Sequence, residues 1–485
     1  MVRCADVSRS HAELQQRAAQ VATGLREAGV AAGDRVAVML RNSIEFLEIS
    51  AGAGMAGASP VPVNWHWRGG ELAHLLSDSG SRVLFVHSEF AETARSVLPA
   101  DVRLIEVGAG YEDWLAAHQP LAEPAGGTGL GMIYTSGTTG SPKGVVRDEI
   151  PPEQLLQLAG NTLHRMGVGP GVRTVIPAPL YHTAPNTLAM IALRVGADIT
   201  VLPAFDAEEF LATVERQRIE QVQMVPTMFV RLLRLPQEVR DRYDISSLQR
   251  VVHSAAPCAV PVKRAIIEWF GPIVHEYYGG SETGPVVWCD SAQWLAHPGT
   301  VGAPIDGAQV RIVGPDDEPV PTGEVGVVYA KPADYWPDFT YLGNDEKRRD
   351  MELDGFVTVG DVGRLDADGF LHLTDRAGDM VISGGVNIYP AEIEAALSGI
   401  DGVRDIAVFG IPDEEFGESL AAHVDVDPAA GITEESLRAA ARGLLAGYKV
   451  PKVIVFDDDL PREESGKLFK RRLRDPYWAA AARSI

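Results

Sequence analysis

Residues 134–144, YTSGTTGSPKG, combine three glycines with several hydroxyl side chains and one lysine. These residue types bind anions, because glycines let consecutive backbone N–H groups converge on a ligand. Apolar residues on both sides predict strands that flank this loop at a sheet edge. The loop is not a Walker-type phosphate loop, since Pro142 precedes Lys143 and Gly144 follows it. The sequence favours a phosphate-binding loop, with a plain surface turn as the alternative.

Residues 275–284, HEYYGGSETG, place two tyrosines, two glycines, a serine and a glutamate after a strand-like run. Tyr277 or Tyr278 is able to stack on a flat ring, and the glycines admit a ligand close to the backbone. Glu282 offers the carboxylate that Mg²⁺ takes together with phosphate oxygens. The alternative is a strand that ends in a glycine turn, with Glu282 in solvent.

Two later segments contain charged residues that could act on a ligand. Within 356–385, Asp361 follows an apolar strand, where a carboxylate is able to hold two sugar hydroxyls, and Arg376 comes fifteen residues later. Within 460–473, Lys467 follows a Ser-Gly turn and is able to neutralise charge that develops in a phosphoryl or adenylyl transfer. The alternatives are a turn and a surface ion pair for the first segment, and a solvated basic tail for the second.

Length and composition bound the class of protein. With 485 residues the chain predicts several domains or lobes rather than one core. Its net charge of −23 argues against broad nucleic-acid or anionic-membrane binding, so an anionic ligand requires local cations such as Lys143 and Lys467. Cys4, Cys258 and Cys289 predict no disulfide framework or zinc site. No signal peptide or membrane span is predicted, and we expect a cytoplasmic protein.

The elements that must position these residues begin with alternating helices and strands. Helical patterns occur at 10–28 and 205–219, among others. The predicted strands lie at 35–40, 59–64, 82–87, 131–136, 174–179, 198–203, 221–226 and 250–255. Near-continuous apolar strands that alternate with helices predict parallel sheets of the α/β class.

The pattern changes twice towards the C-terminus. Residues 310–330 predict short strands around acidic turns, and therefore a β-rich subdomain. The last stretch, about 105 residues, predicts a compact α+β unit of ordinary domain size. It contains a helix opened by Pro390, a strand at 403–410, a helix at 434–445, a strand at 453–458 and a basic tail.

Together these segments resemble the adenylate-forming superfamily of acyl-CoA synthetases, adenylation domains and luciferases, over nearly the whole chain. YTSGTTGSPKG resembles its phosphate loop, YYGGSE its aromatic–Gly–Ser/Thr–Glu element, and VGD at 359–361 its ribose-binding segment. Residues 375–394 are similar to its hinge and first C-terminal segment, and PREESGK at 461–467 to the stretch with its catalytic lysine. The chain is most similar to a stand-alone bacterial fatty-acid or carboxylate–CoA ligase.

The resemblance implies a division of the chain. Residues 1–376 would form a large N-terminal domain of two stacked α/β lobes plus a β-rich subdomain, which binds ATP and the acyl group. Residues 380–485 would form a small mobile α+β domain that carries Lys467. Residues 377–379 would be the hinge between them, with Gly378 as the turning point.

The resemblance also implies ATP as substrate and Mg²⁺ as its metal ion. Glu282 would ligate Mg²⁺, and Lys467 would bridge the substrate carboxylate and the α-phosphate. His182 would line the path to the acyl carboxylate, with a satisfied core histidine as the alternative. The residues implied to contact the nucleotide are Thr135, Ser136, Gly137, Thr138, Thr139, Gly140, Lys143, Ser254, Ala255, Ala256, Pro257, Tyr278, Gly279, Gly280, Ser281, Asp361 and Arg376.

The implied reaction has two halves. The carboxylate attacks the α-phosphorus of ATP and pyrophosphate leaves; the acyl group then passes to coenzyme A, which gives a thioester and AMP. Gly280 stands where the family shapes its acyl pocket, and Thr183, Ala184, Thr227 and Ala255 would add further small walls. This predicts a medium-to-long or bulky cyclic acid. Because the sequence reveals no arginine or lysine near these positions, a dicarboxylic acid is disfavoured.

Coenzyme A is the expected acceptor, since ISGG at 382–385 resembles a strand that meets its pantetheine arm. Tyr448, Lys449 and Lys452 would serve its phosphates, whereas Val386 departs from the glutamate that relatives commonly carry. An amide bond synthetase that uses an amine is the alternative, and a non-catalytic nucleotide-binding homologue is a further one. No carrier domain follows Lys467, so an assembly-line module is not expected. We expect a monomer or homodimer without nucleic-acid or membrane partners.

Overall fold

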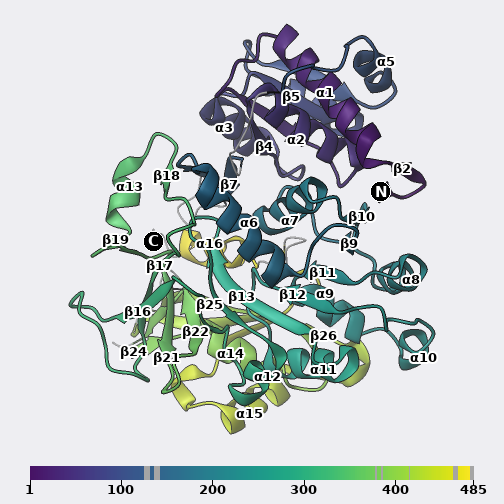
Figure 1. Ribbon diagram of the computed structural model, residues 1–485. Coiled ribbons are helices and arrows are strands. Elements are labelled where there is room, and N and C mark those ends of the chain that lie inside the picture. Colours follow the sequence, from purple (N-terminus) through teal and green to yellow (C-terminus); the bar gives the residue numbers. More distant parts are fainter. Residues whose placement is uncertain are drawn as a thin grey trace.

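The computed structural model describes residues 1–124, 131–135, 143–376, 379–383, 386–413, 415–462 and 468–480. Within these residues the chain has a large N-terminal part with two α/β lobes and a β-rich subdomain, followed by a small α+β part (Figure 1). The predicted α/β class is therefore confirmed.

The first lobe is built on a parallel sheet with the strand order β4-β3-β5-β6. Its strands are β3 (Arg35–Met39), β4 (Ser59–Pro62), β5 (Val83–His87) and β6 (Arg103–Val107). Its helices are α1 (His11–Glu27), α2 (Ile44–Ala56), α3 (Gly69–Ser79), α4 (Ala91–Arg95) and α5 (Tyr111–Ala116). Helix α1 begins where the sequence predicts, because Ser10 and Glu13 form a reciprocal capping box.

The second lobe is built on a nine-stranded sheet with the order β15-β14-β13-β12-β11-β9-β10-β1-β2. The six strands from β13 to β1 in this order are parallel. The strands are β1 (Val2–Cys4), β2 (Val7–Arg9), β9 (Arg173–Ile176), β10 (Asp198–Val201), β11 (Gln221–Met224), β12 (Arg250–His253), β13 (Val274–Gly280), β14 (Gly284–Cys289) and β15 (Ala303–Pro304). The helices are α6 (Pro152–Met166), α7 (Thr183–Arg194), α8 (Ala207–Gln217), α9 (Pro226–Leu233), α10 (Gln237–Arg240), α11 (Val260–Phe270) and α12 (Ser291–Ala296).

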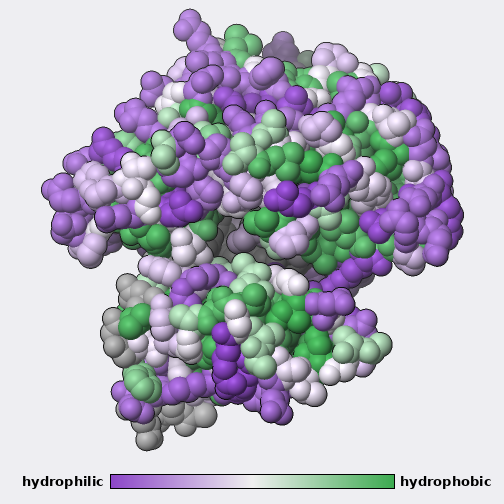
Figure 2. Space-filling view, turned by 90° about the horizontal axis from the view of Figure 1, so that it is seen from below, coloured by the Kyte–Doolittle hydropathy of each residue, from purple (hydrophilic) through white to green (hydrophobic). Residues whose placement is uncertain are grey.

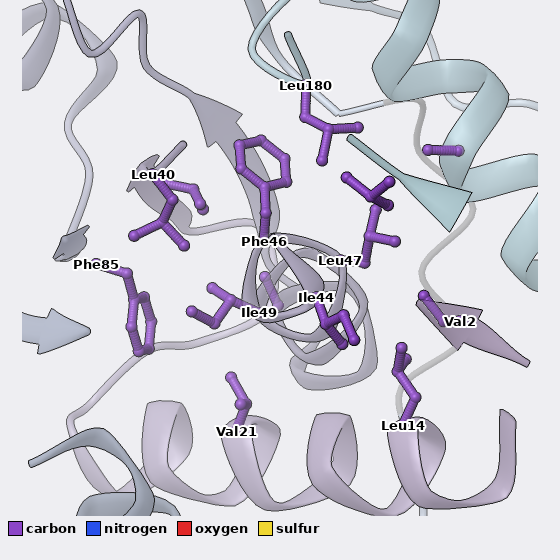
Figure 3. Packing of buried hydrophobic residues seen from close by; sticks show 14 of the residues in the cluster. Val2, Leu14, Val21, Leu40, Ile44, Phe46, Leu47, Ile49, Phe85 and Leu180 are labelled. Atoms are coloured by element: carbon purple, nitrogen blue, oxygen red, sulfur yellow. The ribbon is translucent and has the colours of Figure 1, made fainter. Parts of the chain in front are cut away.

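Helices α1, α2 and α7 lie between the two sheets, and their apolar residues form one core with the facing strands. Successive residues of a buried strand face opposite sides. Val36 and Val38 therefore join this shared core, whereas Ala37 and Met39 pack with α3 on the outer side. Figure 3 shows α2 end-on, with Val21 and Leu14 of α1 on one side of it and Phe46 directed to the other side, towards Leu180. On the far side of the larger sheet, α8, α9 and α11 form a separate core.

A small antiparallel sheet joins the phosphate-loop region to the β-rich subdomain. It consists of β7 (Ile133–Thr135), β8 (Lys143–Arg147) and β18 (Phe339–Tyr341), in the order β18-β8-β7. The prediction that residues 131–136 belong to the parallel series is thus wrong. The connection to the next strand is too short for the crossover that a parallel pair requires, so the two strands form a hairpin.

The β-rich subdomain that the sequence predicts is confirmed. Its strands are β16 (Gln309–Val313), β17 (Gly326–Lys331), β19 (Glu352–Leu353), β20 (Phe356–Val357), β21 (Asp361–Leu365) and β22 (Leu371–Arg376). All the pairs among them are antiparallel. Helix α13 (Asp345–Asp350) follows β18.

The C-terminal part has its own core around Ile393 and Leu397, as predicted. Its elements are β23 (Val381–Ser383), β24 (Val386–Ile388), α14 (Pro390–Leu397), β25 (Val403–Asp413), β26 (Gly417–Val426), α15 (Glu434–Leu444), β27 (Val453–Phe456) and α16 (Lys470–Ala480).

Helix α16 is packed against this domain. Tyr477 packs on Phe409, and the indole N–H of Trp478 donates to the carbonyl oxygen of Gly410 at 3.2 Å. Lys470 lies 3.0 Å from Glu394. The alternative of a solvated basic tail is therefore wrong for this helix, because its apolar side chains cover β25.

The surface in Figure 2 mixes hydrophilic and hydrophobic residues, with a furrow between a larger and a smaller body. None of the helices in the described ranges has the length and apolar character needed to cross a bilayer.

The three cysteines are free thiols, as the sequence predicts, and Cys4 and Cys289 are buried.

Candidate active site

Three groups of predicted site residues follow parallel strands at one edge of the nine-stranded sheet. Ser254 follows β12, and Tyr278 lies near the end of the parallel neighbour β13. His182 lies in the loop that connects β9 to α7. Open α/β sheets bind ligands beyond the carboxyl ends of their strands. The structure thus collects residues that are about a hundred positions apart at an edge suited to ligand binding.

Tyr278 and Asp361, both predicted to contact the nucleotide, are in direct contact with each other. The Tyr278 hydroxyl donates to Asp361 Oδ2 at 2.6 Å. Asp361 is the first residue of β21 and is only 8% exposed. Its cross-strand partner on β22 is Arg376, the residue predicted to help it at the ribose. The Asp361 carboxylate and the Tyr278 ring therefore lie together, next to the backbone of Arg376.

Of the two tyrosines that the sequence left open, Tyr277 faces away from this point. Its hydroxyl accepts a hydrogen bond from Gln223 Nε2 at 2.9 Å, and its ring stacks on Trp288 with a centroid separation of 6.2 Å. Tyr278 is therefore the tyrosine available beside Asp361. Strand geometry explains the choice, since neighbouring residues of β13 face opposite sides of the sheet.

The segment predicted to lie along the adenine is a bent loop after β12. Ser254 is 5% exposed, Ala255 and Pro257 are exposed, and Ala256 is half-buried. Ala255 has φ +75°, a left-handed conformation that is uncommon for residues other than glycine. Strain of this kind occurs preferentially at ligand sites. The loop thus exposes its backbone at the edge where Tyr278 lies.

Close approach of the backbone requires the first glycine of the second motif, whereas the second glycine leaves space beside a side chain. A Cβ atom at Gly279 would clash with the carbonyl oxygen of Gly284 across the β13–β14 pair. A Cβ atom at Gly280 would lie 2.9 Å from Glu282 Oε2 and 3.6 Å from Val359. Any side chain at Gly280 would therefore narrow the space next to the Glu282 carboxylate.

Ser281 links this motif to the His182 loop. Its hydroxyl lies 2.6 Å from the hydroxyl of Thr183, the first residue of α7. His182 is the N-cap residue of α7, and its backbone N–H donates to Pro179 O at 3.1 Å. The structure therefore places His182 one residue from a side chain that contacts Ser281.

Arg147 overturns one expectation about this region. Its Nη2 donates to the carbonyl oxygen of Ser281, so an arginine lies beside Gly280. Burial lowers the pKa of Arg147 to about 10. The expectation that no cation is close to the acyl pocket is wrong, and the argument against a dicarboxylic acid loses its basis. The sequence could not show this contact, because 134 residues separate the two partners.

Glu282 lies in a cluster of basic and phenolic groups. It is 9% exposed, and its Oε1 accepts a hydrogen bond from the Tyr341 hydroxyl at 2.9 Å. Burial and this carboxylate both raise the pKa of Tyr341. Lys143 lies over the Tyr341 ring, with Nζ 5.8 Å from the centroid. Burial and the adjacent Lys347 ammonium lower the pKa of Lys143 to about 8.

This donor set fits a magnesium ion that is shared with phosphates. Mg²⁺ binds through one or two carboxylates together with phosphate oxygens, and Glu282 is a buried carboxylate of this kind. Lys143, Lys347 and Arg147 supply the positive charge that a polyphosphate requires in an acidic protein.

Several predicted residues lie outside the described ranges. They are Ser136, Gly137, Thr138, Thr139 and Gly140 of the phosphate loop, the hinge residue Gly378, and Lys467. Thr135 ends β7 and Lys143 begins β8, so the phosphate loop connects two paired strands.

Sequence reasoning missed Arg147, Tyr341, Lys347 and Gln223. The first three come from β8, β18 and α13, which meet because β18 pairs with β8. Only this long-range pairing brings them to Glu282, and no local motif marks them. Gln223 carries a weak signal, since it is a polar residue inside a strand that is otherwise buried.

The chain matches known proteins over almost its full length. The family model described as AMP-binding enzyme matches residues 1–333, and that of the AMP-binding enzyme C-terminal domain matches residues 392–467. Feruloyl-CoA synthase of Amycolatopsis sp is 37% identical over 478 residues, which cover 98% of this chain and 95% of that protein.

Two solved structures share the fold closely. ATP-bound MatB from Rhodopseudomonas palustris superposes with a TM-score of 0.87 at 28% identity, over 98% of this chain and 95% of that one. The amide bond synthetase McbA from Marinactinospora thermotolerans superposes with a TM-score of 0.86 at 27% identity, over 98% of this chain and 96% of that one.

Proposed function

The chain belongs to the AMP-binding enzyme family, and from this premise we propose that it activates a carboxylic acid with ATP and transfers the acyl group to coenzyme A. The observation that carries the proposal is the convergence of Tyr278, Asp361, Ser281 and Glu282 at one sheet edge. A nucleotide requires such a combination of ring surface, ribose acceptor and phosphate ligands.

In the first half-reaction a carboxylate oxygen attacks the α-phosphorus, and the bond from this phosphorus to the pyrophosphate oxygen breaks. Asp361 holds the ribose hydroxyls and Tyr278 covers the adenine. Ser281 contacts the α-phosphate, while His182 borders the carboxylate path. Positioning and charge neutralisation supply most of the rate, since no group of the protein becomes covalently modified.

The pyrophosphate leaves as a highly charged anion, and cations must face it. Lys143, the first residue of β8, and the adjacent Lys347 stabilise this charge. Mg²⁺, when bound at Glu282, neutralises phosphate charge and orients the polyphosphate. Lys467 bridges the substrate carboxylate and the α-phosphate, by resemblance to the family motif.

The second half-reaction transfers the acyl group. The thiol sulfur of coenzyme A attacks the acyl carbonyl, the bond to the AMP oxygen breaks, and a thioester and AMP result. We place the domain boundary at the hinge 377–379, between domains 1–376 and 380–485. The separate cores of the two parts support this division, and rotation about Gly378 would exchange Lys467 for the acceptor face.

The acceptor is favoured to be coenzyme A because the relative at 37% identity is named as a CoA synthase. Ile382 and Val386 are exposed on the β23–β24 pair, next to the predicted pantetheine strand. Lys449 and Lys452 lie 2.6 Å from Glu392 and Asp413, so coenzyme A phosphates would have to displace these carboxylates. The structural likeness to an amide bond synthetase supports an amine as the alternative acceptor.

The experiment incubates the protein with ATP, Mg²⁺ and panels of fatty, aryl and polycyclic acids, each with coenzyme A or an amine. Mass spectrometry identifies the products. Thioester with AMP supports the proposal, and amide with AMP supports the alternative acceptor. ADP formation or the absence of turnover with every acid would refute both.

Lys467→Ala tests the chemical step separately. We expect pyrophosphate release to fall about 10²- to 10³-fold while ATP binding changes little, because the lysine acts on charge that develops in the transition state. Pyrophosphate release near the wild-type rate would remove Lys467 from this role.

A further inference from the structure

Strand β11 of the nine-stranded sheet has one polar face and one apolar face. On β11, Val222 and Met224 belong to the core with α8, α9 and α11. Gln221 and Gln223 alternate with them and therefore face the other side. This second side is the one covered by α7, because Leu188 of α7 packs in the same core as Val252. Two buried glutamines in a core position are costly unless both ends of each amide are hydrogen-bonded.

Each of these amides is only half used. Gln223 bonds the Tyr277 hydroxyl through Nε2, and Gln221 accepts from Thr174 through Oε1. The opposite ends, Gln223 Oε1 and Gln221 Nε2, have no hydrogen-bond partner among the described residues. Gln223 is 5% exposed, so its open end is not solvated by bulk water. A polar partner is therefore expected there.

The same face carries aromatic side chains that retain solvent access. His275, Tyr277 and Trp288 are all partly exposed, whereas their neighbours Val274, Glu276, Val287 and Cys289 are buried. Tyr277 and Trp288 stack with an interplanar angle of 4°, and the His275 ring lies 5.6 Å from Trp288. Aromatic rings in this arrangement offer a flat apolar surface, which suits another ring.

This surface lies on the opposite side of β13 from Asp361, and it reaches the candidate site through the start of α7. Tyr277 precedes Tyr278, which contacts Asp361, and Ser281 contacts Thr183 at the start of α7. A substrate carboxylate between His182 and Ser281 therefore has the polar face beneath α7 next to it.

We propose that the carboxylic acid substrate is an aromatic hydroxy acid, whose ring packs beside Tyr277 and Trp288 and whose hydroxyl bonds the open end of the Gln223 amide. This inference rests on the proposed function. A hydroxyl both donates and accepts, so it satisfies the amide whichever way its oxygen and nitrogen are oriented.

A recess at the carboxyl ends of β9 and β10 would suit a plain aliphatic tail instead. Its walls include Trp65, Pro179, Phe205 and Met228. Its buried amide, Asn42, is fully engaged, since Nδ2 donates to Ala178 O and Leu202 O and Oδ1 accepts from Leu180 N–H. Arg231 also lines this recess; its other walls are apolar, and Asn42 leaves no amide end for a hydroxyl.

The test uses pairs of acids that differ by one hydroxyl: cinnamic acid against its 2-, 3- and 4-hydroxy forms, and dodecanoic acid against 12-hydroxydodecanoic acid. The readout is kcat/KM for pyrophosphate release from ATP. We expect at least one hydroxycinnamic acid to exceed cinnamic acid by about 10- to 100-fold, because the plain acid leaves a buried amide end unpaired. The aliphatic pair should react more slowly than the best aromatic acid.

Gln223→Leu then tests the residue. We expect the preferred hydroxy acid to lose about 10- to 100-fold in kcat/KM, while cinnamic acid changes less than threefold. Gln221→Leu is the matched control, because it makes the same change on the same face two residues farther from the carboxyl edge. Tyr277→Phe keeps the ring and removes the hydroxyl that orients Gln223, so part of the selectivity should be lost.

The outcomes separate this inference from the proposed function. If no acid releases pyrophosphate, the activation of carboxylic acids itself is refuted. If acids react but plain and hydroxylated members are equal, or if the aliphatic pair is preferred, only the hydroxy-acid assignment fails. Equal losses for both acids in Gln223→Leu would likewise overturn it.

Discussion

Asn42 and Gln223 are buried side-chain amides, but they differ in how much of each amide is used. Asn42 makes three hydrogen bonds, of 2.7, 2.9 and 3.0 Å, from the first lobe to the ends of β9 and β10 in the second. Gln223 makes one bond, to Tyr277, and its Oε1 has no partner within the described chain. A fully bonded amide holds two lobes together, whereas a half-bonded amide is suited to a ligand.

The same contrast holds for charged groups. Lys263 is fully buried and forms an ion pair with Glu276 behind β13, next to His253. Burial keeps the pKa of Glu276 raised, while Lys263 opposes this shift. Lys143 instead lies beside another cation, Lys347, and the Glu282 carboxylate opposes the effect of this cation on its pKa. Opposite charges stabilise each other within the fold, while neighbouring like charges are stabilised by an anionic ligand. Substitution of Lys263 or Glu276 should therefore change the stability of the fold, whereas substitution of Lys143 or Lys347 should change the binding of an anionic ligand.

The largest effect is expected for Lys263→Met. Removal of the lysine leaves Glu276 as an uncompensated buried carboxylate, so the free energy of unfolding should fall by about 3–5 kcal/mol. Denaturant titration followed by circular dichroism measures this loss. Lys263→Met with Glu276→Leu removes both charges and should restore most of the stability. A single variant as stable as the wild type would show that the pair does not contribute to folding.

Asn42→Leu should have the next largest effect. It leaves Leu180 N–H and two carbonyl oxygens without their buried partner, which costs about 1–3 kcal/mol for each group that water cannot reach. We expect a total loss of about 3 kcal/mol in the free energy of unfolding. The ratio of kcat/KM values for hydroxylated and plain acids should stay as in the wild type. A change in that ratio without a loss of stability would reverse the roles of Asn42 and Gln223.

Much of the site followed from local sequence. Tyr278 and Asp361 were each predicted to contact the nucleotide from separate short motifs, but their mutual hydrogen bond was not, because it joins strands of two different sheets. Arg147 and Tyr341 were not anticipated, because their places depend on the pairing of β8 with β18, almost 200 residues apart. When two antiparallel strands are far apart in the sequence, neither strand shows by itself which residues it will pair with. In a strand as short as β18, the residues of the two faces are too few to indicate which face meets the partner.

The errors in the fold have the same origin. The apolar run at 131–136 has the composition of a buried parallel strand, but it forms a hairpin with β8. The basic residues of α16 suggested a solvated tail, whereas Leu473, Tyr477 and Trp478 on the same helix pack against β25. In both cases the amino-acid composition identified the type of element. The element that packs against it decided where it lies in the fold.

Asp361→Asn tests a residue that we expect to act in ligand binding rather than in stability. The amide keeps the size of the side chain and its place beside Tyr278, but it loses the charge that strengthens hydrogen bonds to ribose hydroxyls. We expect the KM for ATP to rise about 10-fold, because a charge-assisted hydrogen bond is worth about 1.5–3 kcal/mol and part of it remains in the amide. The free energy of unfolding should change by less than about 1 kcal/mol. Loss of stability without a change in KM would make Asp361 a structural residue.

Lys347→Met should have the smallest effect, and it is a test of the like-charge pair. The protonated Lys143 ammonium attracts phosphate, and burial and Lys347 hold its pKa at about 8. In the wild type, kcat/KM for ATP should therefore fall as the pH rises through about 8. Removal of the Lys347 charge raises the pKa of Lys143 and moves this fall to higher pH, while binding at pH 7 weakens a few-fold because one cation is lost.

Glu282 and the Tyr341 hydroxyl also face Lys143, and neither is altered by this change, so the shift reports the lysine pair. Arg349→Met removes a positive charge from an exposed position of the same helix and serves as the control. Rate profiles for ATP between pH 6 and pH 10 distinguish the two variants. If Lys347→Met and Arg349→Met move the pH profile equally, the shift comes from a general loss of positive charge. A profile that moves only in Lys347→Met shows that repulsion from the Lys347 ammonium holds down the pKa of Lys143.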